Sequence, residues 1–435
     1  MATVILALTA RVALSLIYSL TLLLCRLTPR ARRRHTGVPP CVVVTGTFYN
    51  PGWFRAHIVP LVRSGVREVI VVSDQPLEEL ANVRFSCPPR WLISVSGRAL
   101  AKFTWLILPG IRHRPDLFMG YHLFPGAVGA LIAGRLFRRP ACYQMTGGPV
   151  EAIGGGWGAE NPLLARLARP SRFVECLAVA LIRQFDLVVV RGSKAQAFLA
   201  HHGLHKSVAV ITGSIAQPHR PRHGDREYDL VFVGRLTEVK RPIMFVKIAA
   251  RVKRQFPSLR AAVVGAGPLL SHMRERSQEL DILGSIEFCG QKSDVSDILT
   301  RSKVFVLTSS SEGLSIAMAE AMGAGVVPVV ADVGELSDLV VNGESGYVVP
   351  PDDLEEYVKR ILLVLRDPSL LDRLSTCAAR TARSRAGVDV IAAQWTDHLV
   401  ELSRRLGTSY EAVANGKRRH TVLDPSGAPR DRHSP

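Results

Sequence analysis

The sequence predicts an α/β protein with two doubly wound, Rossmann-like domains. Short apolar, β-branched runs alternate with helical segments and polar loops along most of the chain, which is typical of parallel sheets with crossover helices. The 435 residues, of which 47% are hydrophobic, suffice for two such domains of about 150 to 200 residues each. We expect the domains at residues 36–217 and 226–384, joined by a Pro- and Arg-containing linker at 218–225.

The charge of the chain points to an anionic partner. A formal net charge of +18 favours nucleic acid, an acidic membrane surface or a phosphorylated substrate. The sequence has no zinc-ligand spacing, no RNP-type aromatic motif and no basic helix with heptads, so it argues against nucleic acid. Its seven cysteines are scattered, which fits neither a metal site nor a disulfide framework and indicates a reducing compartment.

Residues 1–35 are predicted to be a hydrophobic membrane anchor with a basic flank. The apolar run is long enough to cross a bilayer, and the arginines that follow it place the two predicted domains on the cytoplasmic face. Arg11 lies inside the run and argues against a full span. An interfacial helix, or a signal peptide or start-site artefact, is therefore an alternative to a spanning helix.

Residues 302–335 show the strongest signal for a ligand site. An apolar, β-branched run opens into a Thr-Ser-Ser-Ser loop, which is followed by Glu312 and Gly313. Ser315 is a suitable N-cap for a helix over residues 316–322, and a second apolar strand follows. The pattern predicts a strand, a polar loop, a short helix and a strand, which together form a β-α-β unit.

The helix in this unit is expected to bind an anion at its N-terminus. The free N–H groups of Leu314, Ser315 and Ile316 and the helix dipole point the same way. Glu320 lies in the helix among small apolar residues, where a carboxylate needs a polar partner such as ligand hydroxyls. The ordinary alternative is a loop carboxylate at Glu312 and a solvated carboxylate at Glu320.

A second loop in the same domain is predicted to hold a diphosphate. It follows the strand expected at 229–233 and contains Arg235 and Lys240, with Pro242 at the start of the next helix. A guanidinium can grip two phosphate oxygens, and an ammonium adds positive charge. The glycines of AAVVGAGPL at 261–269 lack the third glycine of a dinucleotide fingerprint, so we reject that interpretation.

Three stretches of the first domain are candidates for the other side of the cleft or for a membrane contact. His122 and the loop 45–53 follow predicted strands, so both should line the cleft. The glycine-rich residues 147–161 would form a mobile lid, an acceptor loop or a surface linker. Residues 88–114 interleave basic and aromatic side chains, which suits a membrane interface or an ordinary amphipathic helix.

The segment SEGLSIAMAEAMGAGVVPV resembles the E-x7-E signature of the retaining, GT-B-fold glycosyltransferases of family 4 (group 1). Leu314 and Ser315 stand where that family more often has Phe and Gly. The resemblance implies that Glu312 contacts the donor sugar or the reacting centre. It also implies that Glu320 binds the ribose hydroxyls of the nucleotide.

Other stretches are similar to the same family. The pattern G-R-x-x-x-x-K at Arg235 and Lys240 implies a grip on the donor pyrophosphate. Tyr121-His122 and Thr146-Gly147-Gly148 match positions near the transferred sugar, although Gly147 replaces a downstream histidine.

The resemblance implies a GT-B architecture, in which two Rossmann-like domains face each other across a cleft. A terminal helix at 385–406 would cross back to the first domain. The tail, 407–435, is basic and is expected to be disordered.

The expected activity is transfer of a hexose or related sugar from a nucleoside diphosphate sugar with retention of configuration. A UDP-sugar is favoured over a GDP-sugar as donor, and no cofactor or metal is expected, in keeping with the lack of an Asp-x-Asp motif. The expected acceptor is a saccharide or a lipid-linked saccharide of surface-polysaccharide or glycolipid assembly. The candidate catalytic residues are Glu312, His122, Arg235 and Lys240. The candidate donor-binding residues are Arg235, Lys240, Gly313, Leu314, Ser315, Ile316 and Glu320.

Two other function classes stay open at this point. One is a GT-B enzyme of another reaction type, such as a sugar phosphorylase or a nucleotide-sugar epimerase. The other is a non-catalytic, membrane-associated scaffold, against which the presence of all four charged residues of the two motifs argues.

Overall fold

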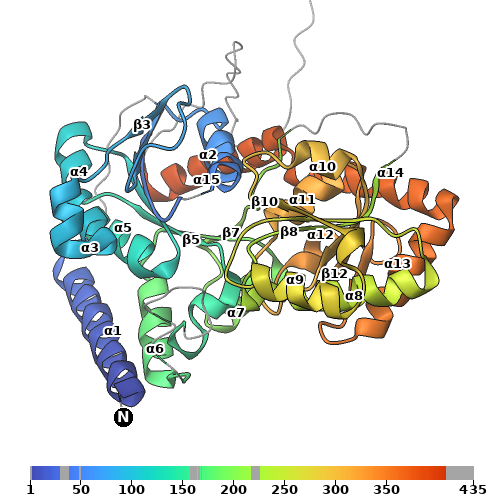
Figure 1. Ribbon diagram of the computed structural model, residues 1–435. Coiled ribbons are helices and arrows are strands. Elements are labelled where there is room, and N and C mark those ends of the chain that lie inside the picture. Colours follow the sequence, from blue (N-terminus) through green and yellow to red (C-terminus); the bar gives the residue numbers. More distant parts are fainter. Residues whose placement is uncertain are drawn as a thin grey trace, which may run out of the picture.

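The computed structural model describes residues 2–29, 39–48, 50–156, 164, 167, 169–216 and 226–407. These residues form two α/β domains that stand side by side (Figure 1). The expected linker, 218–225, and the tail after Gly407 lie outside the described residues.

The first domain is built on a seven-stranded parallel sheet with the order β3-β2-β1-β4-β5-β6-β7. Its order reverses between β1 and β4, so the loops after these two strands open at the switch point where doubly wound sheets bind ligands. The central strands are fully buried, as their near-continuous apolar runs predict. The strands are β1 Cys41–Thr45, β2 Glu68–Val72, β3 Val83–Phe85, β4 Leu117–Tyr121, β5 Ala141–Met145, β6 Leu187–Val190 and β7 Val208–Val210.

The second domain has a six-stranded parallel sheet with the order β10-β9-β8-β11-β12-β13. Here the order reverses between β8 and β11, which are the strands that precede the two predicted binding loops. The strands are β8 Tyr228–Val233, β9 Ala261–Val264, β10 Ile286–Gly290, β11 Ser302–Leu307, β12 Val327–Ala331 and β13 Tyr347–Val349.

Helices cover both faces of each sheet, because successive strand side chains point to opposite sides. In β1, Val42 and Val44 join one hydrophobic cluster, and Cys41 and Val43 join another. The helices of the first domain are α2 Pro51–Arg63, α3 Arg90–Trp105, α4 Ile107–His113, α5 Val128–Phe137, α6 Arg172–Ile182 and α7 Ser193–His201. Those of the second domain are α8 Pro242–Gln255, α9 Leu270–Glu279, α10 Ser296–Thr300, α11 Ile316–Gly323, α12 Leu336–Leu339, α13 Leu354–Arg366 and α14 Pro368–Ala386.

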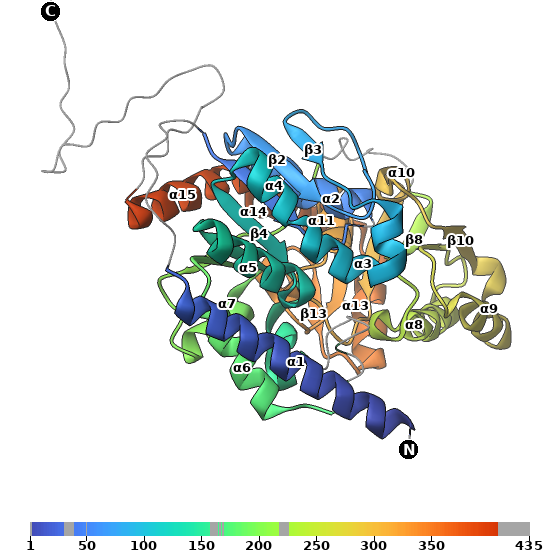
Figure 2. The ribbon, with the colours of Figure 1, turned by 90° about the vertical axis from the view of Figure 1, so that its left-hand side faces the viewer.

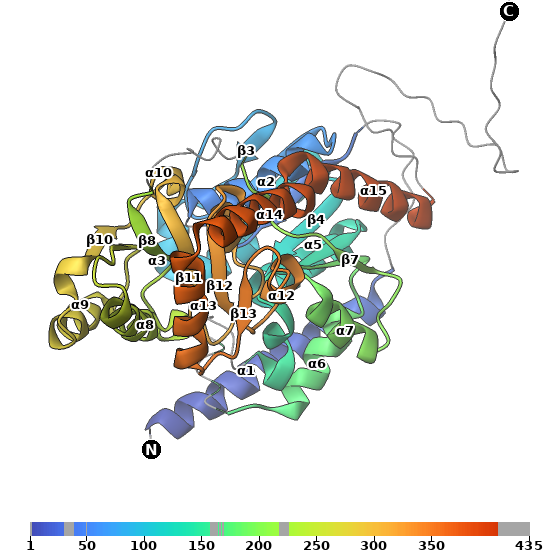
Figure 3. The same ribbon diagram turned by 90° about the vertical axis from the view of Figure 1, so that its right-hand side faces the viewer.

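The last helix, α15 (Val388–Leu406), leaves the second domain and lies on the first (Figure 3). It packs against α2, and Trp395 is buried there in the cluster that contains Leu61. Thr396 Oγ1 donates a hydrogen bond to the carbonyl of Ser64 at 3.0 Å. The helix therefore contributes a side chain to the core of a domain that is distant in sequence.

Helix α1 (Ala2–Leu27) lies along the outer side of the first domain (Figure 2). Leu14, Tyr18 and Cys25 are buried on its inner face, which packs against α5 and α6. By length and composition, two helical segments could cross a membrane, Leu8–Leu27 and Arg90–His113.

Replacing Trp395 by Ala is expected to lower the free energy of unfolding by about 3–5 kcal/mol, because it leaves a large cavity between α15 and α2. Chemical denaturation of the variant measures this loss. Val400, 40% exposed on the same helix, provides the control, and Val400→Ala should change stability by less than about 0.5 kcal/mol. Equal effects of the two variants would contradict the packing described here.

Candidate active site

The two predicted binding loops of the second domain meet in an ion pair. Lys240 Nζ donates to Glu312 Oε1 at 2.5 Å, and the Ser309 hydroxyl donates to the same oxygen at 2.6 Å. The side chains of Lys240 and Glu312 are only 16% and 8% exposed, so the pair is poorly screened by water. The structure thus brings together two candidate catalytic residues that are 72 positions apart.

Hydrogen bonds to backbone carbonyl groups connect these two loops. The Thr308 hydroxyl donates to the carbonyls of Lys240 and Arg241, each at 3.0 Å. The Ser310 N–H donates to the carbonyl of Val239 at 2.8 Å. The serine- and threonine-rich segment after β11 therefore fixes the position of the loop that contains Lys240.

Arg235 is exposed in the loop directly after β8. The backbone of this loop lies against Gly265 and Gly267. A Cβ atom on Gly265 would lie 1.9 Å from the Gly234 carbonyl oxygen, and one on Gly267 would lie 2.4 Å from the Leu236 carbonyl oxygen. The Leu236 N–H also donates to the Ala266 carbonyl at 3.0 Å. The glycines of the rejected fingerprint therefore allow the close backbone packing that supports the Arg235 loop.

Helix α11 begins as the sequence predicts. The Ser315 hydroxyl accepts a hydrogen bond from the Met318 N–H at 3.3 Å, and the Ala319 N–H bonds to the Ser315 carbonyl at 3.1 Å. The N–H groups of Leu314, Ser315 and Ile316 precede these bonds at the positive end of the helix dipole. This end of the helix lies directly after the Glu312 loop, so an anion bound there would be close to Lys240.

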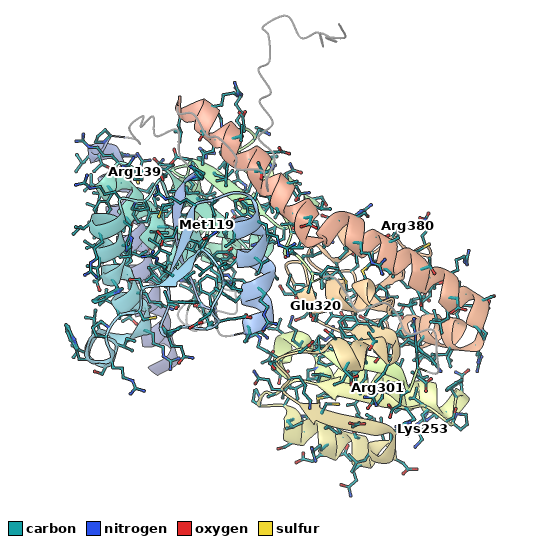
Figure 4. The ribbon with its side chains drawn as sticks, turned by 90° about the horizontal axis from the view of Figure 1, so that it is seen from above. Met119, Arg139, Lys253, Arg301, Glu320 and Arg380 are labelled. Atoms are coloured by element: carbon teal, nitrogen blue, oxygen red, sulfur yellow. The ribbon has the colours of Figure 1, made fainter. Side chains whose placement is uncertain are left out.

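Glu320 lies further along α11, between the two domains (Figure 4). Burial, and secondarily the charge of Asp294, raise its pKa to about 7, while Arg55 on α2 opposes the shift. Its Oε1 is 3.9 Å from the position that a Cβ atom on Gly52 would take. Glu320 therefore lies close to the first turn of α2 in the other domain, with a pKa near neutrality.

His122 follows β4 and has a positive φ of 58° with ψ of 146°, a backbone conformation that is rare outside glycine. Its Nδ1 lies 3.1 Å from Glu151 Oε1 and 3.1 Å from the Thr146 hydroxyl. These two neighbours fix the orientation of an imidazole whose side chain is 44% exposed. The histidine that the sequence singled out is thus held in place by a carboxylate.

Glu151 is buried and accepts hydrogen bonds on both carboxylate oxygens. The Gly147 N–H donates to Oε1 at 2.5 Å, and the Leu123 N–H and the Tyr143 hydroxyl donate to Oε2 at 2.8 and 2.7 Å. Burial raises its pKa, but His122 and these donors outweigh burial, so the pKa lies below its ordinary value. Glu151 is therefore an anionic positioning residue that the sequence analysis did not single out. The sequence feature that could have identified Glu151 is its position as an acidic residue in a glycine-rich, apolar stretch after a strand.

Trp53, at the end of the expected loop 45–53, is a second residue of the site that the sequence did not indicate individually. Its ring stacks on His57 with a centroid distance of 4.2 Å and lies nearly parallel to the His122 ring at 6.5 Å. Burial, and then Arg191, hold the pKa of His57 well below its ordinary value, so this histidine is neutral. In the structure the expected loop 45–53 ends at the N-cap Asn50, so it is the first turn of α2 that places a half-buried indole next to His122.

The two halves of the site touch each other through backbone. A Cβ atom on Gly313 would lie 2.0 Å from the Thr146 carbonyl oxygen, and one on Gly148 would lie 4.0 Å from that of Glu312. Because Thr146 also contacts His122, the Glu312 loop and the His122 loop are neighbours in the described structure. Residues from both domains therefore line one site.

Carboxylates of the second domain hold the same closed arrangement. Glu335 accepts hydrogen bonds from the N–H groups of Lys194 and Ala195 at 2.9 and 2.7 Å, at the N-terminus of α7. Asp338 accepts one from the Ser193 hydroxyl at 2.7 Å. The carboxylates thus accept hydrogen bonds from N–H groups that have no partner within the helix, and their negative charge complements the positive end of the helix dipole.

The second domain is similar in sequence to a known protein family. Residues 215–381 match the family model described as glycosyl transferases group 1. The chain is 29% identical over 178 residues to an exopolysaccharide phosphotransferase of Streptomyces coelicolor, covering 40% of this chain and 19% of that protein. It is 28% identical over 141 residues to the UDP-Gal:alpha-D-GlcNAc-diphosphoundecaprenol alpha-1,3-galactosyltransferase of Escherichia coli, covering 32% and 36%. The matched parts span less than half the length of these relatives.

Solved structures match the fold over most of the chain. Anabaena HepE in complex with UDP-glucose superposes with a TM-score of 0.66 at 18% identity, over 83% of this chain and 100% of that one. A sucrose-phosphate synthase of Thermosynechococcus elongatus gives 0.66 at 16% identity, over 85% and 99%. The chain therefore has the expected GT-B fold, and its second domain is similar to group 1 glycosyltransferases.

Gly313→Ala is expected to separate the two halves of the site, because the added methyl group would collide with the Thr146 carbonyl. We expect a loss of about 1–3 kcal/mol in the free energy of unfolding, the usual cost of overpacking. Chemical denaturation tests this against Gly284→Ala, since a Cβ on Gly284 meets nothing within 4 Å. If Gly313→Ala is as stable as Gly284→Ala, the domains are not closed on each other here.

The raised pKa of Glu320 leads us to expect a pH dependence of ligand binding. Its raised pKa means that it is mostly protonated below about pH 7 and a carboxylate above. A carboxylate accepts hydrogen bonds from hydroxyl groups better than the neutral acid does. On the expectation from the sequence that Glu320 binds ribose hydroxyls, affinity for a nucleoside diphosphate sugar, whose diphosphate does not titrate in this range, should therefore rise between pH 6 and pH 8. Calorimetric titration measures it, and Glu320→Gln should flatten the profile. An unchanged slope in that variant would assign the titration to another group.

Proposed function

We propose that the protein is a retaining glycosyltransferase that moves a sugar from a nucleoside diphosphate sugar to an acceptor. The main support is the Lys240–Glu312 ion pair at the N-terminus of α11, inside the segment that matches group 1 glycosyltransferases. In this arrangement a cation, a carboxylate and free backbone N–H groups converge at the switch point of one sheet. Such a site is suited to an anionic leaving group next to a centre that becomes positively charged.

In this proposal the second domain binds the donor. Arg235, Lys240 and the N–H groups of Leu314, Ser315 and Ile316 hold the diphosphate, and Glu320 accepts hydrogen bonds from the ribose hydroxyls. A UDP-sugar is the proposed donor, since the E. coli relative is named for UDP-Gal and the HepE structure contains UDP-glucose.

The catalytic demand is stabilisation of charge at the leaving group and at the sugar. The bond between the anomeric carbon and the diphosphate oxygen breaks, the acceptor oxygen bonds to the same face, and its proton passes to the leaving phosphate. Preorganised positive charge at Arg235, Lys240 and the helix end stabilises that phosphate, so the proposal requires no metal ion, cofactor or separate base. A bound diphosphate would compete for Lys240 and free the negative charge of Glu312 for the oxocarbenium-like centre.

The first domain would position the sugar and the acceptor. His122, oriented by Glu151 and Thr146, lies where it can hold a sugar hydroxyl, and Trp53 offers an aromatic surface beside it. We propose a lipid-linked saccharide as acceptor and the cytoplasmic membrane face as the location. The E. coli relative acts, by its name, on a diphosphoundecaprenol-linked sugar, and two helical segments of this chain are apolar enough for a membrane.

Nucleotide binding tests the proposal. Thermal shift of the full chain with UDP, GDP and ADP should show stabilisation by one nucleotide. Lys240→Ala and Arg235→Ala should each weaken it by about 10- to 100-fold, because each removes a charged hydrogen-bond donor to phosphate. Lys247→Ala, an exposed charge on α8, is the matched control and should bind like the parent. Folded protein that responds to no nucleotide would contradict the donor site.

The products test the reaction type. With a matching donor and acceptor, proton NMR of the fresh product should show the anomeric configuration of the donor. An inverted product would contradict retention. Dependence on inorganic phosphate, or turnover without an acceptor, would identify a phosphorylase or an epimerase instead.

A further inference from the structure

Helix α1 presents two different apolar faces. Its inner face is buried against α5 and α6, as described above. Its outer face exposes a continuous stripe of large apolar side chains at three- and four-residue spacing, each between 49% and 75% exposed. These are Leu8, Val12, Leu16, Leu20, Leu23 and Leu27. Such a stripe is left without a partner in the described structure and is costly to keep in water.

Helices α3 and α4 expose a second apolar surface on the same side of the molecule. Figure 2 shows α1, α3 and α4 together on the side that faces the viewer, and α5 contacts both α1 and α4. The exposed apolar side chains of α3 and α4 are Trp91, Val95, Leu100, Ile107 and Ile111. Among the described residues, only Leu283, Leu363 and Val400 are large apolar side chains exposed outside the first domain and α1.

The charge of the surface formed by α1, α3 and α4 indicates the kind of partner that it fits. Residues 1–67 contain no Asp or Glu, and neither do residues 80–115, so both surfaces lie on segments whose charged side chains are all basic. Arg26, Arg90, Arg98 and Arg112 are exposed on these helices. Apolar stripes with exposed arginines fit a lipid surface that contains anionic headgroups.

The packing of α1 decides how it can meet that surface. Tyr18 is fully buried, and its ring contacts that of Phe124 at a centroid distance of 6.4 Å. Arg11 donates a hydrogen bond to the Arg169 carbonyl at 3.3 Å, which places its charge at the flank of the stripe. A spanning helix would have to leave this domain and expose its buried face, or pull charged parts of the domain into the hydrocarbon.

We propose that α1, α3 and α4 form one docking face for an anionic lipid surface, with α1 lying in the plane of the surface. We call the eleven exposed apolar side chains of these helices the membrane face. This mode of docking goes beyond the proposed transfer reaction, and only its link to the acceptor rests on that reaction.

Two of the three docking helices, α3 and α1, are attached to loops of the proposed acceptor side. Lys102 of α3 is buried and donates to the carbonyl of Gly46 at 3.1 Å, and it pairs with Asp74 at 3.1 Å. Tyr18 of α1 packs on Phe124, two residues after His122. Burial, and secondarily the Glu151 carboxylate, raise the pKa of Tyr18. Docking would therefore hold the loop 45–53 and His122 close to the lipid, within reach of an acceptor carried there.

Vesicle cosedimentation of the full chain, freed of detergent, tests the docking face. We expect binding to phosphatidylcholine vesicles that contain phosphatidylglycerol, and weaker binding to pure phosphatidylcholine or at high salt. Leu16→Asp and Val95→Asp should each weaken binding by about tenfold or more. Leu363→Asp makes the same change at a side chain 44% exposed on α13 and should bind like the parent. Unchanged melting temperatures would show that the variants fold.

Labelling distinguishes an in-plane helix from a spanning one. In a chain with the exposed Cys176 replaced by Ser, an environment-sensitive dye on Leu8→Cys, Leu16→Cys or Leu23→Cys reports depth in the bilayer. Equal, shallow depths at the three positions are expected for α1 in the plane. A maximum depth at position 16, with the ends near opposite surfaces, would overturn the in-plane arrangement.

Other outcomes would overturn the lipid assignment itself. Equal vesicle binding by the parent and both aspartate variants would remove the membrane face from the contact. Self-association without lipid that Leu16→Asp abolishes, in a protein that ignores vesicles, would assign the face to a second copy of the chain. Vesicle binding is measured without nucleotide, so a failure of the proposed donor site leaves this test intact.

Discussion

The candidate site depends on a backbone contact between the two domains that leaves no space for a side chain. Gly313 lies against the Thr146 carbonyl, so Glu312 and His122, which neighbour this contact, are held at a defined separation. The carboxylate of Glu335 at the N-terminus of α7 supports the same closure. Each loop extends from the carboxyl end of a parallel strand, and the cleft is the place where these ends face each other.

Three carboxylates of the site, one buried and two partly buried, differ in what offsets the cost of their burial. Glu312 is paired with Lys240. Glu151 accepts hydrogen bonds from several donors, and with His122 these outweigh burial, so the pKa of Glu151 falls below its ordinary value. For Glu320, the charge that opposes the effect of burial is that of Arg55, and burial prevails, so the pKa of Glu320 rises to about 7. Burial without sufficient compensation makes Glu320 the carboxylate that gains most from a ligand with hydroxyl groups.

The N-terminal helix is part of the first domain as well as a candidate membrane contact. Its buried face supplies Tyr18 to the core beside Phe124, and its exposed face is apolar along its length. A helix with two apolar faces has high overall hydropathy, and for this reason composition alone does not distinguish it from a spanning segment. The separation into a buried and an exposed stripe becomes visible only when its packing partners are known.

The sequence by itself determined the fold class and the position of the binding loops along the chain. Apolar runs, glycines and capping residues such as Ser315 act locally, so their order already indicates parallel sheets, the N-terminus of α11 and the loops with Glu312 and Lys240. Only the tertiary structure decided that Glu151 orients His122, that Trp53 lies beside that histidine, and that Lys240 pairs with Glu312. These contacts join residues that are far apart in the sequence, and only the packing of the strands and loops brings them together.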